Sequence, residues 1–418
     1  MRLFRKVYPL EFGLKPFINQ PPDSAYLTVC KGVEATGKFL RPNTPVTTVL
    51  SADSSYPRLL SNNYKLLLLD DYSIYEVNAD WSLTKVGDVL AGTYWTYADF
   101  QKYIILSNGQ SNYEYINGQV SPTTNMPIGR SLCRFRGRII SGGILSQWYD
   151  CDEGYIAWSD IGSKSFELSV KNEAGYLNAE IGEILRVDSD DELVYCYGTD
   201  GVAILWPHMQ AFGFKRVSNK GIMFEGSACR NLFIDSTGTM CVVNKGVVQE
   251  VGFQHLFEGL NVAIEYDSSE SAFYLLTNEK AYKFRDGNLS ELNGTLRAVC
   301  RLGGSLIGIG HLTEGFEIWT DWLTFGVGGI KTLMSVEVLG EGFEGLQISA
   351  KIHYLESGIE QQIPFFDLAG TFTTLKASGD LLSIGLKGGF KDGFKLSGLG
   401  LNVQFADKRI IRGYAYDG

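Results

Sequence analysis

Residues 273–294, which read FYLLTNEKAYKFRDGNLSELNG, decide the fold. Apolar residues alternate in this stretch and predict three short strands, which begin near Phe273, Ala281 and Leu289. The dipeptide Asp286-Gly287 separates the last two strands. Asp and Gly tolerate the positive φ of a tight hairpin turn, so this dipeptide between apolar runs predicts a β-hairpin.

The same pattern of short strands and tight turns recurs in residues 64–87 (YKLLLLDDYSIYEVNADWSLTKVG), 103–120 (YIILSNGQSNYEYINGQV) and 232–252 (LFIDSTGTMCVVNKGVVQEVG). The turn glycines Gly246 and Gly287 are 41 residues apart, and Gly118 and Gly246 are 128 apart, about three steps of the same length. A period of roughly 40–45 residues made of four short strands is typical of a β-propeller blade.

Composition agrees with an all-β protein. The chain has 418 residues, of which 44% are hydrophobic, and it contains 48 glycines, 22 tyrosines and 24 phenylalanines. No segment keeps a helical apolar pattern for three turns. The net charge of −10 argues against a sequence-independent grip on DNA, because such binding needs a basic surface.

We therefore predict an all-β chain with a β-propeller of six blades, with seven blades as the alternative. The predicted parts are an extended N-terminal arm (1–25), the propeller (26–330) and a C-terminal β-sandwich or barrel domain (331–418), with about seven strands in its last ~90 residues. Within the propeller, residues 26–42 open the first blade, and these residues together with 298–325 close the ring. Blades are predicted at 43–88, 89–128, 129–187, 188–218, 219–254 and 255–297, with a further strand group at 298–330. The polar excursion at 164–182 is the predicted projecting loop.

The seven cysteines at 30, 133, 151, 196, 229, 241 and 300 show no CxxC or metal-ligand spacing. We expect buried free thiols and synthesis in a reducing cytoplasm. Residues 1–13 lack the features of a signal peptide, and no apolar run approaches the length of a membrane span.

No catalytic, cofactor or metal site is predicted. His208, His255, His311 and His353 fall in four separate segments without ligand spacing. The glycine-rich run 303–310 lacks the Lys and helix of a phosphate loop, so we interpret it as strand and turn. The acidic residues considered for a glycosidase pair are Asp160, Asp188, Asp235 and Glu265. Turn residues explain Asp160 and Asp235 better, and the cluster formed by 188, 190, 191 and 192 is interpreted as a solvated turn rather than a Ca²⁺ site.

Two groups of side chains leave alternatives open. Arg134, Arg136 and Arg138 alternate and are expected on one face of a strand, either solvated or in contact with nucleic acid or an acidic subunit. The aromatic clusters at 94–97, 148–149 and 319–322 are expected mainly in the core between blades. The other possibility is that some form a sugar-stacking face or a subunit interface.

The run YIAWSDIGSKSFELSVKNEAGYLNAEIGEILRVDSDDELVYCYGTDGVAIL, beginning at Tyr155, resembles a passage found in tailed-phage virion proteins. In that passage a W-S-D/E-x-G-x-x-x-F strand precedes a loop and then an I…L…D-x-L-V-x-Y-G-x-x-G-I/V segment. Residues 31–42 resemble the G-G-L-x-x-R-P opening of the same group. Its best-known members are the packaged-DNA stabilisation or hub proteins of short-tailed phages. The resemblance is specific over about 155–206.

This resemblance implies a non-enzymatic virion subunit, made in the host cytoplasm, that acts as a connector, hub, nozzle or tail-tip component. Several copies, six favoured, would form a ring with other tail proteins around the DNA channel, with passive contact to the DNA and no membrane span. The alternative is a carbohydrate-binding or glycan-cleaving propeller for receptor recognition. A third possibility, a cytoplasmic protein-interaction propeller, is disfavoured because no Trp-Asp signature ends the blades.

Overall fold

The predicted hairpin turns are present in the computed structural model, which describes residues 3–50, 52, 54, 56–62, 65–209 and 211–405. Both residues of each turn have positive φ, as a type I′ hairpin requires. The pairs are Asn117-Gly118, Lys245-Gly246 and Asp286-Gly287. The Gly303-Gly304 pair also has positive φ and is followed by a strand, which confirms the interpretation of that run as turn and strand.

The chain is almost entirely β, as predicted, and it divides into two compact units. One unit comprises residues 46–279 and 295–311, and the other comprises residues 1–45, 280–294 and 312–418. No helix in the described part of the chain is both long and apolar enough to cross a membrane.

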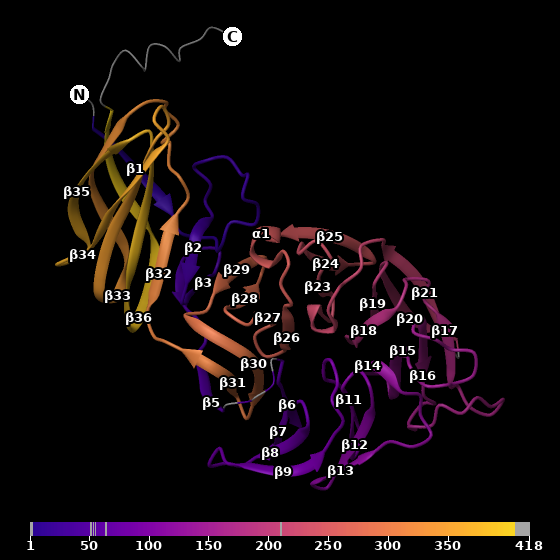
Figure 1. Ribbon diagram of the computed structural model, residues 1–418. Coiled ribbons are helices and arrows are strands. Elements are labelled where there is room, and N and C mark those ends of the chain that lie inside the picture. The colour runs from indigo at the N-terminus through magenta and orange to yellow at the C-terminus, as the bar shows by residue number, and fades with distance from the viewer. Residues whose placement is uncertain are drawn as a thin grey trace, which may run out of the picture. The chain divides into compact units, whose positions relative to one another are not determined.

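The unit of residues 46–279 and 295–311 holds six separate sheets in the six-blade β-propeller arrangement (Figure 1). Four of them are β6 (Arg58–Asn62) to β9 (Leu83–Asp88), β10 (Thr96–Phe100) to β13 (Gln119–Pro122), β14 (Gly129–Phe135) to β17 (Gly175–Asn178), and β18 (Ile184–Ser189) to β21 (Ala211–Ser218). The remaining two are β22 (Ala228–Cys229) to β25 (Val247–Gly252) and β30 (Gly294–Leu302), β31 (Ser305–Leu312) and β5 (Val46–Leu50).

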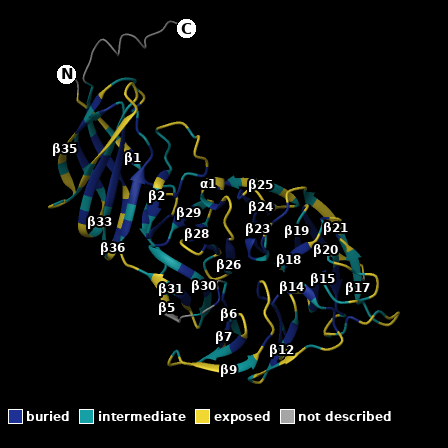
Figure 2. Ribbon diagram, viewed as in Figure 1, coloured by how far each residue is buried: buried dark blue, intermediate teal, exposed yellow. Residues whose placement is uncertain are grey.

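The strands inside these sheets are β7 (Lys65–Leu69), β8 (Ser73–Val77), β11 (Tyr103–Ser107), β12 (Asn112–Ile116), β15 (Arg138–Ile144), β16 (Tyr155–Trp158), β19 (Val194–Gly198), β20 (Val202–His208), β23 (Leu232–Ile234) and β24 (Met240–Asn244). A 3-10 turn (Glu225–Ser227), the short helix α1 (Gln254–Phe257) and the antiparallel hairpin of β26 (Ala263–Asp267) and β27 (Ala272–Leu276) complete the unit. Figure 2 shows exposed residues along outermost strands such as β9.

Ring closure uses a segment other than the one expected. The strand β5, of sequence VTTVL, pairs in parallel with β31 and supplies the third strand of that sheet. The prediction that residues 26–42 open the first blade is wrong, because they pair within the other unit. The prediction that residues near 298–325 take part in closure is confirmed for β30 and β31. A β-branched strand supplied from far upstream covers an edge that would otherwise be open.

The other unit is a curled sheet whose strands pair antiparallel except for β2 and β29, which pair in parallel. Its strands are β1 (Leu3–Pro9), β2 (Leu27–Lys31), β3 (Val33–Ala35), β4 (Leu40–Pro42), β28 (Ala281–Arg285), β29 (Asn288–Glu291), β32 (Phe316–Thr320), β33 (Lys331–Tyr354), β34 (Ile359–Asp367), β35 (Phe372–Gly379) and β36 (Leu381–Phe405). The order is β28-β29-β2-β32-β36-β33-β34, with β1 also on β36 and β35 also on β33.

Four strands occupy residues 331–405, where about seven were expected. Two of them, β33 and β36, are 24 and 25 residues long. The glycine-rich run 388–393, whose composition predicts a loop, lies inside β36, and Gly393 with positive φ lies where the register between β33 and β36 shifts. Bulges of this kind bend a strand without ending it. The amino-acid pattern of one long, bulged strand therefore resembles that of several short strands.

The two units also divide the chain differently from the boundaries expected at 25 and 330. Residues 3–9 of the expected arm form β1, which pairs with β36 from Leu3↔Gln404 to Pro9↔Gly398. Residues 26–45 and the predicted sixth-blade strands β28 and β29 join the same unit, since β2 pairs with both β32 and β29. Pairing partners far along the chain, which local patterns do not reveal, set this division.

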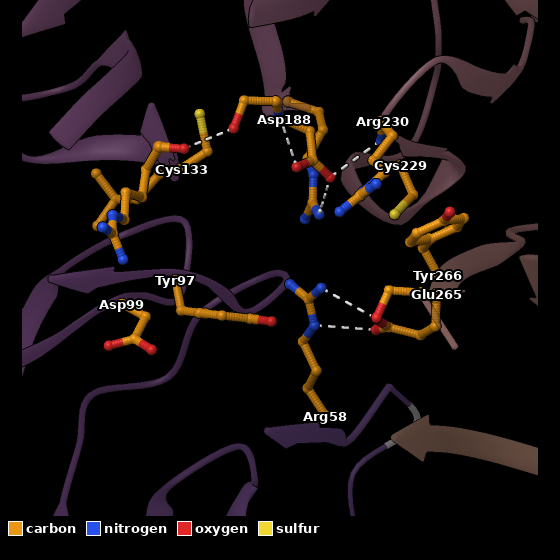
Figure 3. A pocket seen from close by; sticks show the side chains of 14 residues that line it. Arg58, Tyr97, Asp99, Cys133, Asp188, Cys229, Arg230, Glu265 and Tyr266 are labelled. Atoms are coloured by element: carbon orange, nitrogen blue, oxygen red, sulfur yellow. Dashed lines mark hydrogen bonds and ion pairs between the residues drawn. The ribbon is translucent and has the colours of Figure 1, made fainter. Parts of the chain in front are cut away.

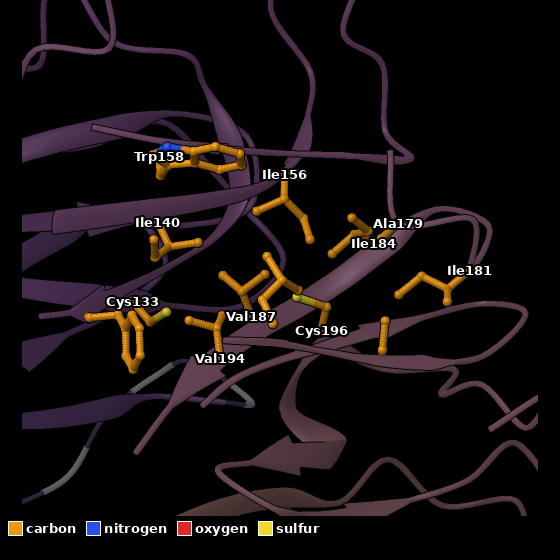
Figure 4. Packing of buried hydrophobic residues seen from close by; sticks show 13 residues of the cluster. Cys133, Ile140, Ile156, Trp158, Ala179, Ile181, Ile184, Val187, Val194 and Cys196 are labelled. Atoms are coloured by element: carbon orange, nitrogen blue, oxygen red, sulfur yellow. The ribbon is translucent and has the colours of Figure 1, made fainter. Parts of the chain in front are cut away.

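Apolar residues from the sheets β14–β17 and β18–β21 interlock into one core (Figure 4). Ile140, Ile184 and Val187 are fully buried there. The backbones approach closely at Gly142 and Gly143, where an added Cβ atom would lie 2.4 Å from Val187 Cγ1 and 2.3 Å from the Ile184 carbonyl oxygen. Glycine at these two positions therefore lets neighbouring sheets pack at close range.

We expect Ile140→Ala to lower the free energy of unfolding by about 2–5 kcal/mol, because it leaves a cavity in this close-packed core. The measurement is the urea midpoint followed by tryptophan fluorescence. The matched control is Ile161→Ala, which removes the same atoms from a side chain that is exposed. Equal midpoints for the two variants would contradict the packing described here.

Candidate functional site

A cavity of about 310 Å³ lies where the first strands of several sheets converge (Figure 3). Its walls come from β6, β10, β14, β18 and β22 and from the hairpin strand β26. Seven of its residues are ionisable groups of opposite charge: Arg58, Arg134, Arg186, Arg230, Asp99, Asp188 and Glu265. Successive strand residues point to opposite faces, so every second residue of such strands can reach a shared centre.

Arg58 is buried and holds β6 against β26. Its Nε lies 2.9 Å from Glu265 Oε1, and its Nη2 donates to Glu265 Oε2 at 3.1 Å. Its Nη1 donates to the Trp95 carbonyl oxygen at 2.5 Å. One carboxylate and one carbonyl thus compensate the charge of the guanidinium ion, although its Nε makes no hydrogen bond among the described residues.

Arg186 and Asp188 lie two residues apart on β18 and share a face of that strand. Arg186 Nη2 donates to Asp188 Oδ2 at 3.2 Å, and backbone N–H groups of Ser189 and Arg230 also donate to this carboxylate. Burial alone would raise the pKa of Asp188, but Arg186 and these two N–H groups outweigh it and hold the pKa below its ordinary value. Asp188 therefore stays ionised.

The Arg186 guanidinium is only partly satisfied. Its side chain is 4% exposed, and neither Nε nor Nη1 has a hydrogen-bond partner among the described residues. Arg58 lines the same cavity and repels it. The site thus contains buried donors that face no protein acceptor.

Asp99 and Tyr97 border the opposite side of the cavity from Arg230 (Figure 3). Burial raises the pKa of Asp99 above its ordinary value, although Arg134 and a hydrogen bond from Asn62 Nδ2 at 3.1 Å act against it. Burial also raises the pKa of Tyr97 to about 12, so the phenol stays protonated. Asp99 and Asp188 are therefore carboxyl groups whose pKa values are moved in opposite directions.

A second cavity of about 160 Å³ shares Tyr97, Glu265 and Tyr266 with the first. Arg301 of β30 borders it and forms an ion pair with Asp267, with Nε 2.9 Å from Oδ1 and Nη2 2.5 Å from Oδ2. The polar interior therefore continues from β18 round to β30.

The structure separates the four acidic candidates. Asp188 and Glu265 line the cavity together, whereas Asp160 and Asp235 cap turns, as expected. Asp235 Oδ1, for example, accepts from the backbone N–H groups of Thr237 and Thr239, both at 2.9 Å. The prediction that Asp188 lies in a solvated turn is wrong. It lies inside the strand β18, which ends at Ser189, and only the following residues 190–192 form the turn.

The expectation that three arginines share one strand face is also wrong. Arg134 lies in β14 and Arg138 in β15, while Arg136 and Gly137 form the turn between them with positive φ at both residues. Arg138 is buried and pairs with Glu173. Arg134 is the one member of this trio that lines the cavity.

The histidines remain apart, on β20, α1, β31 and β33. Within the described ranges, no group of three or more His, Cys, Asp and Glu side chains is placed to hold a metal ion. All seven cysteines are free thiols, as expected, and five are buried. Of the aromatic clusters, Tyr94, Trp95 and Trp319 are core residues, whereas Tyr149 is 50% exposed.

Sequence reasoning missed Arg58, Asp99 and Arg186 as site residues. A signal was present, because charged residues interrupt otherwise apolar first strands at alternate positions. Arg186-Val187-Asp188 and Glu265-Tyr266-Asp267 are two examples. A charged side chain in a buried strand destabilises the fold unless an ion pair or a ligand satisfies it. Charged residues at such positions therefore indicate a candidate site.

Comparison with known proteins gives only distant structural matches. No family model and no curated protein matches the chain. Among solved structures, a quinoprotein alcohol dehydrogenase-like protein from Bacteroides thetaiotaomicron is 13% identical, with 59% of this chain and 68% of that chain covered and a TM-score of 0.37. PorZ from Porphyromonas gingivalis is 10% identical, with coverage of 66% and 36% and a TM-score of 0.40. BamB from Moraxella catarrhalis is 8% identical, with coverage of 66% and 94% and a TM-score of 0.36.

We expect Arg58→Ala to lower the free energy of unfolding by about 3–5 kcal/mol, because it leaves the Glu265 carboxylate buried without its partner. The midpoint of thermal or urea unfolding measures this loss. Lys85→Ala serves as the control, since it breaks the exposed pair with Asp88 and should leave the midpoint unchanged. A variant of Arg58 as stable as the wild type would refute the structural role of the pair.

Asp188→Asn and Asp99→Asn should respond to pH with opposite signs. The lowered pKa of Asp188 contributes stability that is present above the pKa of the unfolded chain, near 4, and is lost as pH falls through the folded value. The gap in melting temperature between wild type and Asp188→Asn should therefore narrow in acid. The raised pKa of Asp99 disfavours the folded state at neutral pH, so Asp99→Asn should be the more stable protein there and lose that advantage in acid. Melting curves between pH 3 and pH 7 show, for each variant, whether its difference in melting temperature from the wild type grows or shrinks as the pH falls.

Proposed function

We propose that the chain is a non-enzymatic structural subunit of a bacteriophage tail, a connector, hub, nozzle or tail-tip protein. In this proposal several copies, six favoured, assemble with neighbouring tail proteins around the DNA channel. The resemblance over residues 155–206 motivates the proposal, and the propeller arrangement is the architecture that this resemblance implies.

The observation that carries the proposal is an exposed apolar surface on the outer hairpin β20–β21. Trp206, Met209 and Phe214 are 36%, 94% and 40% exposed. Trp206 pairs with Gly213 across the hairpin, and Phe214 pairs with Leu205, so the two aromatic residues lie on opposite faces. Apolar residues gathered on both faces of one hairpin are typical of a surface that another protein covers.

A second surface of the same kind lies on β1. Leu3 and Val7 are 63% and 54% exposed, and they lie on the same face of the strand because they are four residues apart. In the described part of the chain β1 pairs with β36 alone, so its other edge keeps unpaired backbone groups. An edge strand with exposed apolar residues offers a place where a neighbouring chain adds a strand.

The charged interior also suits a structural role. The pairs Arg58–Glu265 and Arg301–Asp267 link β26 to β6 and to β30, which belong to different sheets, and each pair neutralises one carboxylate. The net charge of −10 suits a subunit that lines a DNA channel, because a negative surface repels DNA and lets it pass without binding.

The proposal is tested by copy number. Light scattering of the purified chain gives its solution mass, and quantitative mass spectrometry of purified phage particles gives its stoichiometry. We expect a ring in solution or a small fixed number of copies per particle. A 46.3 kDa monomer that is absent from particles would count against the tail assignment.

Met209→Asp should reduce incorporation into particles or rings at least tenfold, because it places a charge in an apolar contact. The readout is the amount of variant in particles relative to wild type, together with its melting temperature to show that it folds. Leu260→Asp is the control, since Leu260 is 51% exposed and lies outside the hairpin. Equal loss in both variants would argue against β20–β21 as the contact surface.

One observation favours a second candidate, a propeller that binds or cleaves a glycan. Asp99 and Asp188 line one cavity with pKa values moved in opposite directions, as the acid and the base of a glycosidase require. Glycan arrays and release of reducing ends test this candidate. Activity that Asp99→Asn abolishes and Asp160→Asn spares would favour it over the tail proposal.

A further inference from the structure

We propose that the cavity lined by Arg134, Arg186 and Arg230 binds a tetrahedral oxyanion of the phosphate type, either free or as a group on a small molecule. This inference does not rest on the tail function, and it concerns a ligand that neither candidate function includes. Its anchor is Arg186, the least exposed of the three arginines.

The first argument is the incomplete pairing of Arg186. Its Nε and Nη1 are buried donors without an acceptor in the described part of the chain, while its Nη2 donates to Asp188. A buried donor on a charged group that makes no hydrogen bond weakens the folded state substantially. An acceptor supplied by a ligand would remove that cost, and an anion would do so best.

The second argument is the balance of charge in the cavity. Four arginines face three carboxyl groups there. Glu265 is paired with Arg58 and Asp188 with Arg186, while burial raises the pKa of Asp99 above its ordinary value. The cavity is therefore positive inside a chain whose net charge is −10. Arg58 and Arg186 repel each other, and an anion between them would reverse that repulsion.

The third argument is the direction from which the donors come. Arg134 belongs to β14, Arg186 to β18, and Arg230 follows β22, so three different sheets supply the three guanidinium groups. Arg230 is held in place over the Tyr266 ring, with its guanidinium carbon 4.1 Å from the ring centroid. A planar carboxylate meets one guanidinium edge well, whereas a tetrahedral anion presents oxygens in several directions at once.

The cavity also has the size and the additional donor that such a ligand needs. Its volume of about 310 Å³ accommodates a phosphate group with water or with a small attached group. The Tyr97 phenol, which stays protonated, is a neutral donor on the wall. The adjoining cavity of about 160 Å³ gives an attached group room to extend.

The test is calorimetric titration of the full chain with inorganic phosphate at constant ionic strength, which removes nonspecific screening effects. We expect saturable binding and a rise in melting temperature with phosphate. Arg134→Gln should weaken binding about tenfold or more, the loss typical of one charge-assisted hydrogen bond. Arg134 is exposed on its strand, so this variant should fold normally.

The matched control is Arg136→Gln, two residues along the chain and outside the cavity lining, which should bind phosphate as the wild type does. The double variant Arg186→Gln/Asp188→Asn replaces the buried ion pair by two neutral amide side chains and should abolish binding. Absence of binding and of thermal stabilisation in the wild type at about 10 mM phosphate would overturn the proposal, since affinity that weak is not that of a built site. Equal affinities of wild type, Arg134→Gln and the double variant would overturn it as well.

Discussion

The propeller unit depends on the parallel pairing of β5 with β31. Val46 is in register with Leu306, about 260 residues away along the chain. Such a contact costs loop-closure entropy, but this cost grows only as the logarithm of the length, so a short strand suffices to close a very long loop. Once closed, the sheet of β30 and β31 gains its third strand, and each sheet can pack against neighbours as Ile140 and Val187 do.

Closure has a chemical consequence at the centre. The first strands of successive sheets converge there, so residues far apart in sequence become neighbours: Arg58 meets Glu265, and Arg186 lies near Arg58. Charge at this position is tolerated only where ion pairs or ligands satisfy it. Paired residues hold strands together, while the donors of Arg186 that make no hydrogen bond within the described part of the chain remain available for binding.

Local patterns in the sequence predicted much of this fold, because hairpins are local. The dipeptides Asp286-Gly287 and Asn117-Gly118 predict type I′ turns, and the structure has these turns at the expected positions. Pairings between distant segments have no local signature, so the place of residues 26–42, the length of β33 and the role of β5 could not be read in advance. The site could not be predicted for the same reason. In the sequence, Asp188 resembles a turn residue because Asp190 follows it, and only the structure shows that it lies in a strand and pairs with Arg186.

The order of the chain sets the order in which its parts can form during synthesis. The propeller residues 46–279 and 295–311 are interrupted by only a short segment, so the ribosome delivers them nearly as one block. The curled sheet is different, because β1 is made about 390 to 400 residues before the part of β36 with which it pairs. Strand β1 must therefore wait, unpaired, until β36 has emerged. Folding from the N-terminus onward would thus complete the propeller first, and a prematurely ended chain would keep its early apolar strands exposed to chaperones and proteases.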